Sequence, residues 1–217
     1  MEDYVKTEII ERTLQRVYSV TLKEDNGDPE TSRIGGKFSW PVKKPFPEGM
    51  IFLAQINFAE VPNSKILPTS GLLQFFISDM DDESGLVVFH EVPDAFEVRE
   101  TEVENTPIIK PAVMEFKPHM EAMSYTDYRF PTDDESAWDM EEFQGGGTKL
   151  LGYPFFCQGD PREYREDLRK YDTLLFQLDS EEDYTMWGDV GVANFFINGD
   201  DLRRNDFSDV YFTWDCM

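Results

Sequence analysis

The sequence is short of cysteine and histidine. In 217 residues it has two cysteines, Cys157 and Cys216, and two histidines, His90 and His119. Two cysteines cannot form a disulfide framework or a four-cysteine zinc site, which favours a reducing compartment. Neither histidine lies in a motif that would join it to a serine or cysteine nucleophile. The sequence therefore predicts no catalytic residue, no metal site and no cofactor, and it predicts that both histidines are exposed or structural.

Long apolar segments are also missing. No run comes near the roughly 18 apolar residues that a membrane-spanning helix needs. The start, MEDYVKTEIIERTLQR, is charged throughout and lacks the apolar core of a signal peptide. These features predict a cytoplasmic protein with no membrane partner.

Positive charge is scarce relative to negative charge. The chain has 20 Lys and Arg against 44 Asp and Glu, which gives a formal net charge of −24. Because nucleic acids and anionic membranes are bound through cationic side chains, neither is expected as a partner. A basic protein is the expected partner, and solubility alone is the other explanation of the charge. The acids expected on a partner-binding surface are Asp79, Asp81, Asp82, Glu83, Glu181, Glu182 and Asp183.

Apolar residues make up 40% of the chain and aromatic residues 14%, which is enough for a globular core. The links between strand-length apolar runs are mostly too short for a crossover helix, so antiparallel pairing is favoured. The prediction is a mainly β fold, with α+β as the alternative, and a few short helices. Strands are expected at 51–58, 72–77, 86–90, 96–99, 113–116, 174–178, 192–197 and 210–214, and helices at 3–14, 133–143 and 162–170.

One phrase occurs twice in the chain. GLLQFFISDMD begins at Gly71 and GVANFFINGDD begins at Gly191, 120 residues later. We interpret the repeat as two duplicated antiparallel β units related by a pseudo-twofold axis. Since strand side chains alternate, the first phenylalanine of each pair should face one side of its sheet and the second the other. These residues are Phe75 and Phe195, then Phe76 and Phe196.

The repeat sets the expected domain organisation. Residues 1–32 are predicted as an N-terminal helix and strand that lead into a single domain, 33–217. The two units cover about 34–93 and 146–216 and are joined by an acidic connecting region. GGGTK at 145–149 lacks the spacing of a Walker loop and is predicted to be a flexible joint.

A glutamine interrupts an apolar strand in each unit, at Gln55 and Gln177. A buried glutamine must satisfy its amide hydrogen bonds, so one interpretation is that each ties its strand to a neighbouring loop. The other is that both face a cleft between the units, with Trp187 and Asp189 as further ligand-binding residues.

Several motifs recur along nearly the whole chain, from about residue 33 to 216. They are IGG (34–36), FLAQINFAEVP (52–62), LPTSGLLQFFIS (67–78), KLLGYPFF (149–156), QGDPR (158–162), LLFQLDS (174–180), MWGDVGVANFFI (186–197) and DFSDVYFTWDC (206–216). Together they resemble the YwqG-like family, bacterial proteins of largely unassigned function. The resemblance implies a compact, mainly β fold built from a duplicated unit, and it implies no known catalytic residues. Some members are considered as immunity partners of bacterial toxins.

Different functions remain open at this point. The first is a non-catalytic acidic protein-binding module, an immunity-type partner of a cationic protein. The alternative is an enzyme or small-ligand binder that uses a cleft between the two units, which a deep pocket there would favour. A third is a domain that acts only within a larger assembly.

Overall fold

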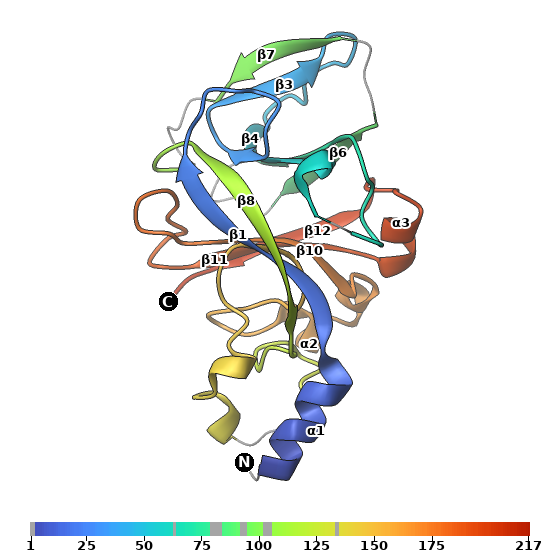
Figure 1. Ribbon diagram of the computed structural model, residues 1–217, viewed down its shortest axis with the longest axis vertical. Coiled ribbons are helices and arrows are strands. Elements are labelled where there is room, and N and C mark those ends of the chain that lie inside the picture. The colour runs from blue at the N-terminus through green and yellow to red at the C-terminus, as the bar shows by residue number, and fades with distance from the viewer. Residues whose placement is uncertain (1–2, 63, 79–83, 92–94, 102–105, 133–134) are drawn as a thin grey trace.

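The computed structural model describes residues 3–62, 64–78, 84–91, 95–101, 106–132 and 135–217 (Figure 1). Helices are short and strands dominate, so the predicted mainly β fold is confirmed. No helix in these ranges is both long and apolar enough to cross a bilayer. The helices are α1 (Asp3–Thr13), α2 (Pro161–Tyr164) and α3 (Gly199–Arg203). The strands are β1 (Gln15–Glu24), β2 (Arg33–Ile34), β3 (Lys37–Pro41), β4 (Ile51–Asn57), β5 (Leu72–Ile77), β6 (Gly85–His90), β7 (Phe96–Glu100), β8 (Ala112–Glu121), β9 (Lys149–Leu151), β10 (Thr173–Asp179), β11 (Val192–Ile197) and β12 (Val210–Asp215).

Ten strands form one curved sheet in the order β12-β11-β10-β9-β1-β8-β2-β4-β5-β6. Every pairing between these strands is antiparallel. The sheet curls until its two edge strands, β6 and β12, approach each other, so it is nearly closed. β3 and β7 pair separately and lie at one end of the molecule, with α1 at the other (Figure 1).

The repeated phrase occupies equivalent positions in two three-stranded meanders, β4-β5-β6 and β10-β11-β12. Each meander has a β-bulge in its first strand, at Phe52/Ala54 and at Leu174/Phe176. Beyond each bulge the glutamine of the first strand lies opposite a polar residue of the second. These pairs are Gln55 with Gln74 and Gln177 with Asn194.

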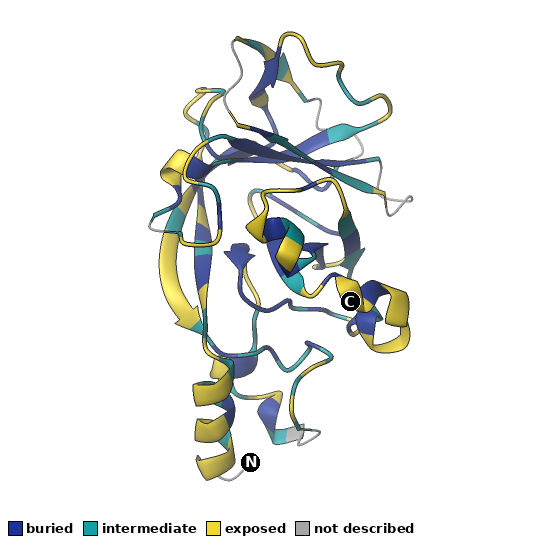
Figure 2. Cartoon of the chain, turned by 90° about the vertical axis from the view of Figure 1, so that its right-hand side faces the viewer, coloured by how far each residue is buried: buried dark blue, intermediate teal, exposed yellow. Residues whose placement is uncertain are grey.

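The main core fills the inside of the curved sheet with side chains from both meanders. Phe75 lies 4.8 Å from Phe176 and 5.0 Å from Phe195, measured between ring centroids. Phe76 and Phe196 belong instead to two separate clusters on the outer face of the sheet. The predicted alternation of the four phenylalanines is therefore confirmed. Figure 2 shows much of the sheet buried, whereas α1 and the second half of β8 are largely exposed.

Three predicted elements differ from the structure. In place of a helix at 133–143, the described part of this segment has 3₁₀ turns at Glu135–Ala137 and Glu141–Phe143. A continuous helix would place the carboxylates of Asp139 and Glu142 side by side, whereas separate turns let Ala137 and Phe143 pack against Ile9.

The helix predicted at 162–170 begins as expected at Pro161 but breaks at Arg165 into α2 and a 3₁₀ turn. β8 extends to Glu121, past Pro118, where the prediction had ended it. Beyond Val113 its second edge pairs with no described strand, so a proline is accommodated there.

Candidate functional site

Gln55 is fully buried and all of its amide donors are used. Its Nε2 donates to the carbonyl oxygens of Pro29 and Thr31, at 3.0 Å each. Its Oε1 accepts a hydrogen bond of 2.7 Å from Nε2 of Gln74. The side chain thus ties β4 to the loop that precedes β2.

Gln177 has the equivalent role in the other meander. Its Nε2 donates to the carbonyl oxygens of Gly145 and Gly147, at 3.0 and 2.8 Å, and its Oε1 accepts from the backbone N–H of Phe155 at 2.8 Å. These bonds anchor the GGGTK segment to β10, and Lys149 within it is buried. The prediction of a flexible joint at 145–149 is therefore wrong.

The four residues predicted to line a cleft lie in different surroundings. Gln55 and Gln177 are on the outer face of the sheet under separate loops. Trp187 is buried in the main core, its ring centroid 6.1 Å from Phe212 and 5.9 Å from Trp214. Asp189 is exposed in the loop before β11. The structure brings none of them together around one cavity.

The predicted acidic surface is placed only in part. Asp79, Asp81, Asp82 and Glu83 lie outside the described residues. Glu182 and Asp183 are exposed in the turn after β10, and Glu181 beside them is half-buried.

Glu181 lines a cleft of about 470 Å³, which we call the acidic cleft. Its walls come from β1, the end of β8, the segment around Lys149 and the end of β10. The register brings them together because β9 pairs with both β1 and β10. Its titratable residues are His119, Glu121, Lys149, Asp179 and Glu181.

Two carboxylates of the acidic cleft are held by neutral donors. Asp179 Oδ2 accepts from the N–H of Gly147 at 2.6 Å, and Glu181 Oε1 accepts from Oγ1 of Thr148 at 2.8 Å. Burial raises the pKa of Asp179, and burial together with the charge of Asp179 raises the pKa of Glu181. Neither carboxylate forms an ion pair within the described part of the chain.

Among the described residues, Lys149 is the only lysine or arginine that lines the acidic cleft, and it forms an ion pair with Glu121. Its Nζ lies 2.7 Å from Oε1 of Glu121, and burial lowers its pKa although Glu121 opposes the shift. Asp179 and Glu181 therefore have no ion-pair partner among the described residues, although the charge of Lys149 also acts on Asp179. The described residues contain no group of three or more His, Cys, Asp or Glu placed to hold a metal ion.

Comparison with known families identifies the chain. A family described as a domain of unknown function, DUF1963, matches residues 32–216. The chain belongs to this family. The match includes both meanders and every titratable residue of the acidic cleft. No curated protein matches the chain.

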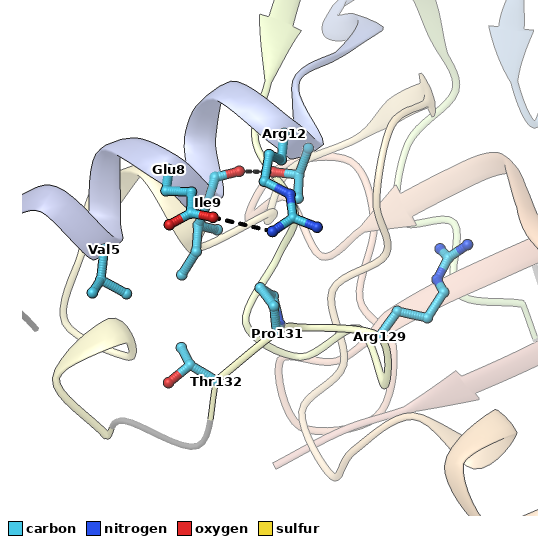
Figure 3. Close-up of a pocket in the computed structure, with 8 residues that line it drawn as sticks. Val5, Glu8, Ile9, Arg12, Arg129, Pro131 and Thr132 are labelled. Carbon is cyan, nitrogen blue, oxygen red and sulfur yellow. Dashed lines mark hydrogen bonds and ion pairs between the residues drawn. The ribbon is translucent and has the colours of Figure 1, made fainter.

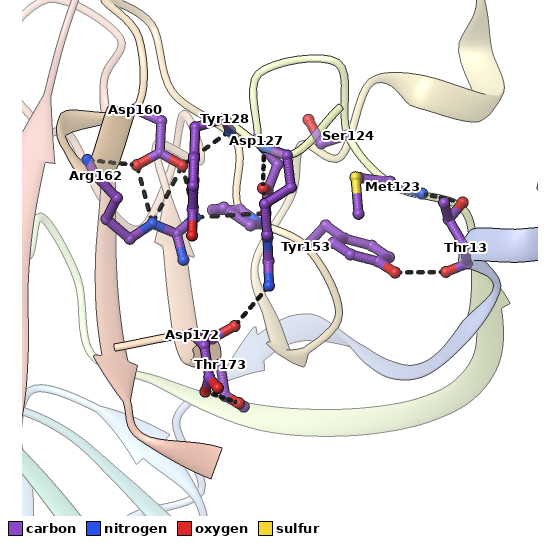
Figure 4. Close-up of polar contacts among 12 residues, drawn as sticks. Thr13, Met123, Ser124, Asp127, Tyr128, Tyr153, Asp160, Arg162, Asp172 and Thr173 are labelled. Atoms are coloured by element: carbon purple, nitrogen blue, oxygen red, sulfur yellow. Dashed lines mark hydrogen bonds and ion pairs between the residues drawn. The ribbon is translucent and has the colours of Figure 1, made fainter. Parts of the chain in front are cut away.

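The QGDPR motif of the DUF1963 domain forms a buried ion-pair network (Figure 4). Asp160 caps α2 and binds Arg162, with Oδ2 to Nη2 at 2.6 Å. Arg162 lies 3.4 Å from Asp127, and Asp127 in turn pairs with Arg129 at 2.6 Å. These contacts join α2 to the segment around Tyr128, and the two acids balance the charges of the two arginines.

A further cavity of the DUF1963 domain, about 420 Å³, lies between α1 and residues 129–132 (Figure 3). Val5, Ile9 and Pro131 supply an apolar wall. Arg12 pairs with Glu8 at 3.1 Å, and Arg129 is held by Asp127, so the cavity has little net charge to attract a ligand.

Sequence reasoning missed Thr148 and Lys149 as site residues of the DUF1963 domain. A signal was present, because SRIGG at 32–36 and TKLLG at 148–152 align as equivalent segments. In both segments a buried cation lies opposite the glutamine in the first strand of the neighbouring meander. Arg33 lies opposite Gln55, and Lys149 lies opposite Gln177.

Proposed function

We propose that the protein is a non-catalytic, cytoplasmic binding module for a cationic protein, of the immunity type that the YwqG-like resemblance implies. The observation that carries the proposal is the pair Asp179 and Glu181. Their carboxylates are partly buried, burial raises their pKa values, and neither forms an ion pair with a described cation, although the charge of Lys149 acts on Asp179 from a distance. A lysine or arginine side chain of a partner would supply the missing charge.

The surroundings of the acidic cleft suit a protein partner. Exposed Glu182 and Asp183 extend the negative charge from the cleft onto the surface. The net charge of −24 would draw a basic protein toward the molecule and raise the association rate.

An enzyme or small-ligand binder with a cleft between the meanders is less well supported. The space between the meanders is filled by Phe75, Phe176 and Phe195. The amide donors of Gln55 and Gln177 are used by backbone carbonyls.

Capture of partners from the native cell, followed by association kinetics, tests the proposal. We expect the association rate to fall as salt rises, because the Debye length shortens from about 30 Å at 0.01 M to about 10 Å at 0.1 M. The double variant Asp179→Asn with Glu181→Gln should bind more weakly than Glu163→Gln with Glu166→Gln. The second pair removes the same charge from exposed positions near α2.

Any of three results would contradict the proposal. The first is an association rate that does not change with salt, and the second is a partner more acidic than basic. The third is equal affinity in the cleft variant and the matched control, which would leave solubility as the explanation of the charge.

A further inference from the structure

A smaller cavity, about 210 Å³, opens on the first meander, away from the acidic cleft. It lies where the end of β4, the start of β5 and the end of β6 meet the start of β7. Its wall is mostly apolar, from Leu72 and Phe96, and it also includes His90. The exposed residues Glu30 and Glu91 lie at its rim.

His90 is buried, with 6% of its surface exposed, and its ring is held in place. Nε2 lies 2.9 Å from Oε1 of Gln74, and the ring of Trp40 packs edge-on at 5.1 Å between centroids. Nδ1 makes no hydrogen bond to any described residue. The ring lines the cavity, and Nδ1 is its nitrogen without a hydrogen-bond partner among the described residues.

The protonation of His90 follows from a chain of amides. Gln55 directs Nε2 at two backbone carbonyls, so its Oε1 must face Gln74. Gln74 uses Nε2 for that oxygen and for the carbonyl of Ser39, at 2.7 Å, so its Oε1 must face His90. A carbonyl oxygen only accepts, and Nε2 of His90 is therefore the protonated nitrogen.

His90 consequently presents a lone pair on Nδ1. Burial, and to a smaller extent the charge of Lys44, lowers the pKa of His90 to about 4, so the ring is neutral at physiological pH. The charged groups at the cavity, Glu30 and Glu91, are also acceptors. Asn57 is occupied on both sides, since its Nδ2 donates to the carbonyl of Glu30 and its Oδ1 accepts from the N–H of Ala59.

We propose that this cavity binds a small primary amine with an apolar body. The body would pack against Leu72 and Phe96, and the ammonium group would donate to Nδ1 of His90 while facing Glu30 and Glu91. Such a ligand matches an apolar wall beside His90, which can accept a hydrogen bond, and the negatively charged Glu30 and Glu91. The hydroxyl of Ser70, which also lines the cavity, can accept as well as donate. This site is separate from the protein-binding acidic cleft, and it stands or falls independently.

The test titrates the intact protein with 2-phenylethylamine by calorimetry and by NMR. Ethylbenzene, which has the same body without the donor, and 3-phenylpropanoate, which carries the opposite charge, are the comparison ligands. We expect saturable binding of the amine and at least tenfold weaker binding of the other two. Equal binding of ethylbenzene, or no binding of the amine, would overturn the proposal.

Substitutions at the exposed rim residues Glu30 and Glu91 remove charge without changing the apolar wall, so they separate the contribution of charge to binding from that of packing. Glu30→Gln and Glu91→Gln should each weaken amine binding by about two- to fivefold, because exposed ion pairs contribute up to about 1 kcal/mol. Glu163→Gln, which removes an exposed charge in α2, should change nothing. Equal effects of all three would show that only the overall charge acts.

The protonation of the two ring nitrogens of His90 is measured by ¹⁵N NMR on the unsubstituted protein. We expect Nε2 protonated and Nδ1 unprotonated in the free protein, with the Nδ1 resonance shifting as the amine binds. A proton on Nδ1 in the free protein, or an Nδ1 chemical shift that does not change when the amine is added, would refute the assignment of His90 as the acceptor.

Discussion

At the scale of single residues, a buried cation and a buried glutamine make similar contacts beside each meander. Arg33 Nη2 lies 2.6 Å from Oδ1 of Asp25, and Lys149 Nζ lies 2.7 Å from Oε1 of Glu121. Each cation is the first residue of a short strand, β2 or β9, and lies opposite a glutamine. That glutamine binds the loop that precedes the short strand. The interpretation that glutamines tie strands to loops therefore describes their contacts.

Replacing either glutamine by alanine tests this structural role. Gln55→Ala would leave the carbonyls of Pro29 and Thr31 without their donor, and Gln177→Ala would do the same to Gly145 and Gly147. Since each buried unsatisfied group costs about 1–3 kcal/mol, we expect the free energy of unfolding to fall by at least about 2 kcal/mol in urea denaturation.

The matched control for the glutamine variants is Gln158→Ala, because Gln158 is exposed. It should change the free energy of unfolding by less than about 0.5 kcal/mol. If Gln55→Ala and Gln177→Ala were as mild as this control, the loops would not depend on the glutamines.

Glu181 allows a prediction on pH. Its pKa in the folded protein is raised, so ionisation is harder in the folded than in the unfolded state. The wild type should therefore lose stability as pH rises from the ordinary glutamate pKa, about 4.3, through the higher folded value. Glu181→Gln avoids this loss, and its thermal midpoint should equal or exceed that of the wild type at pH 7.

The stability difference between Glu181→Gln and the wild type should grow with pH across that window and be constant above it. Thermal unfolding at several pH values measures it. A variant whose disadvantage increases with pH would show that the carboxylate stabilises the fold, which would weaken its assignment to a partner.

At the scale of elements, one face of each meander packs into the shared core, and the other face is covered by a separate segment of the chain. Phe38 and Trp40 of β3 pack against Phe76. In the other meander, Phe156 from the segment before α2 packs against Phe196. Both covers also bond to the sheet, since Gln74 donates to Ser39 and Asn194 donates to Phe155. An outer cover and an inner core explain why β5 and β11 are apolar on both faces.

Alanine substitutions at Phe75, Phe76, Phe195 and Phe196 test this two-sided burial. All four side chains are fully buried, so each change should lower the free energy of unfolding by roughly 3–5 kcal/mol. Denaturant unfolding measures the effect. Losses below about 1 kcal/mol at all four positions would remove them from the core.

At the scale of the whole molecule, the sheet depends on a tight approach between its two edge strands. Gly85 at the start of β6 lies against β12, where an added Cβ would overlap Phe212 and crowd the ring of Phe195. Closure in this manner covers part of two strand edges that would otherwise be open to other chains. It also brings the two meanders around one core.

Gly85→Ala should therefore lower the free energy of unfolding by about 1–3 kcal/mol, the range for overpacking. Gly146→Ala is the control, because its nearest atom would be Oδ2 of Asp179 at 3.7 Å. Equal effects of the two substitutions in denaturant unfolding would mean that the approach of β6 and β12 is loose.

The sequence by itself determined the strands, because runs of apolar residues bounded by turn formers occur where β4, β5, β10, β11 and β12 lie. It also located the two meanders through their repeated phrase, although common descent by duplication stays a prediction. The segment at 133–143 was predicted wrongly, because packing of Ala137 and Phe143 against α1 outweighs local helical preference.

Only the tertiary structure decided the sites. The acidic cleft exists because β9 joins β1 to β10, which brings Glu121 and Lys149 beside Asp179 and Glu181. Which nitrogen of His90 carries the proton depends on Gln74 and Gln55, 16 and 35 residues away in the chain, and burial keeps the ring neutral. Charge state and hydrogen-bond direction are set by such neighbours and by burial, and neither is written in the local sequence.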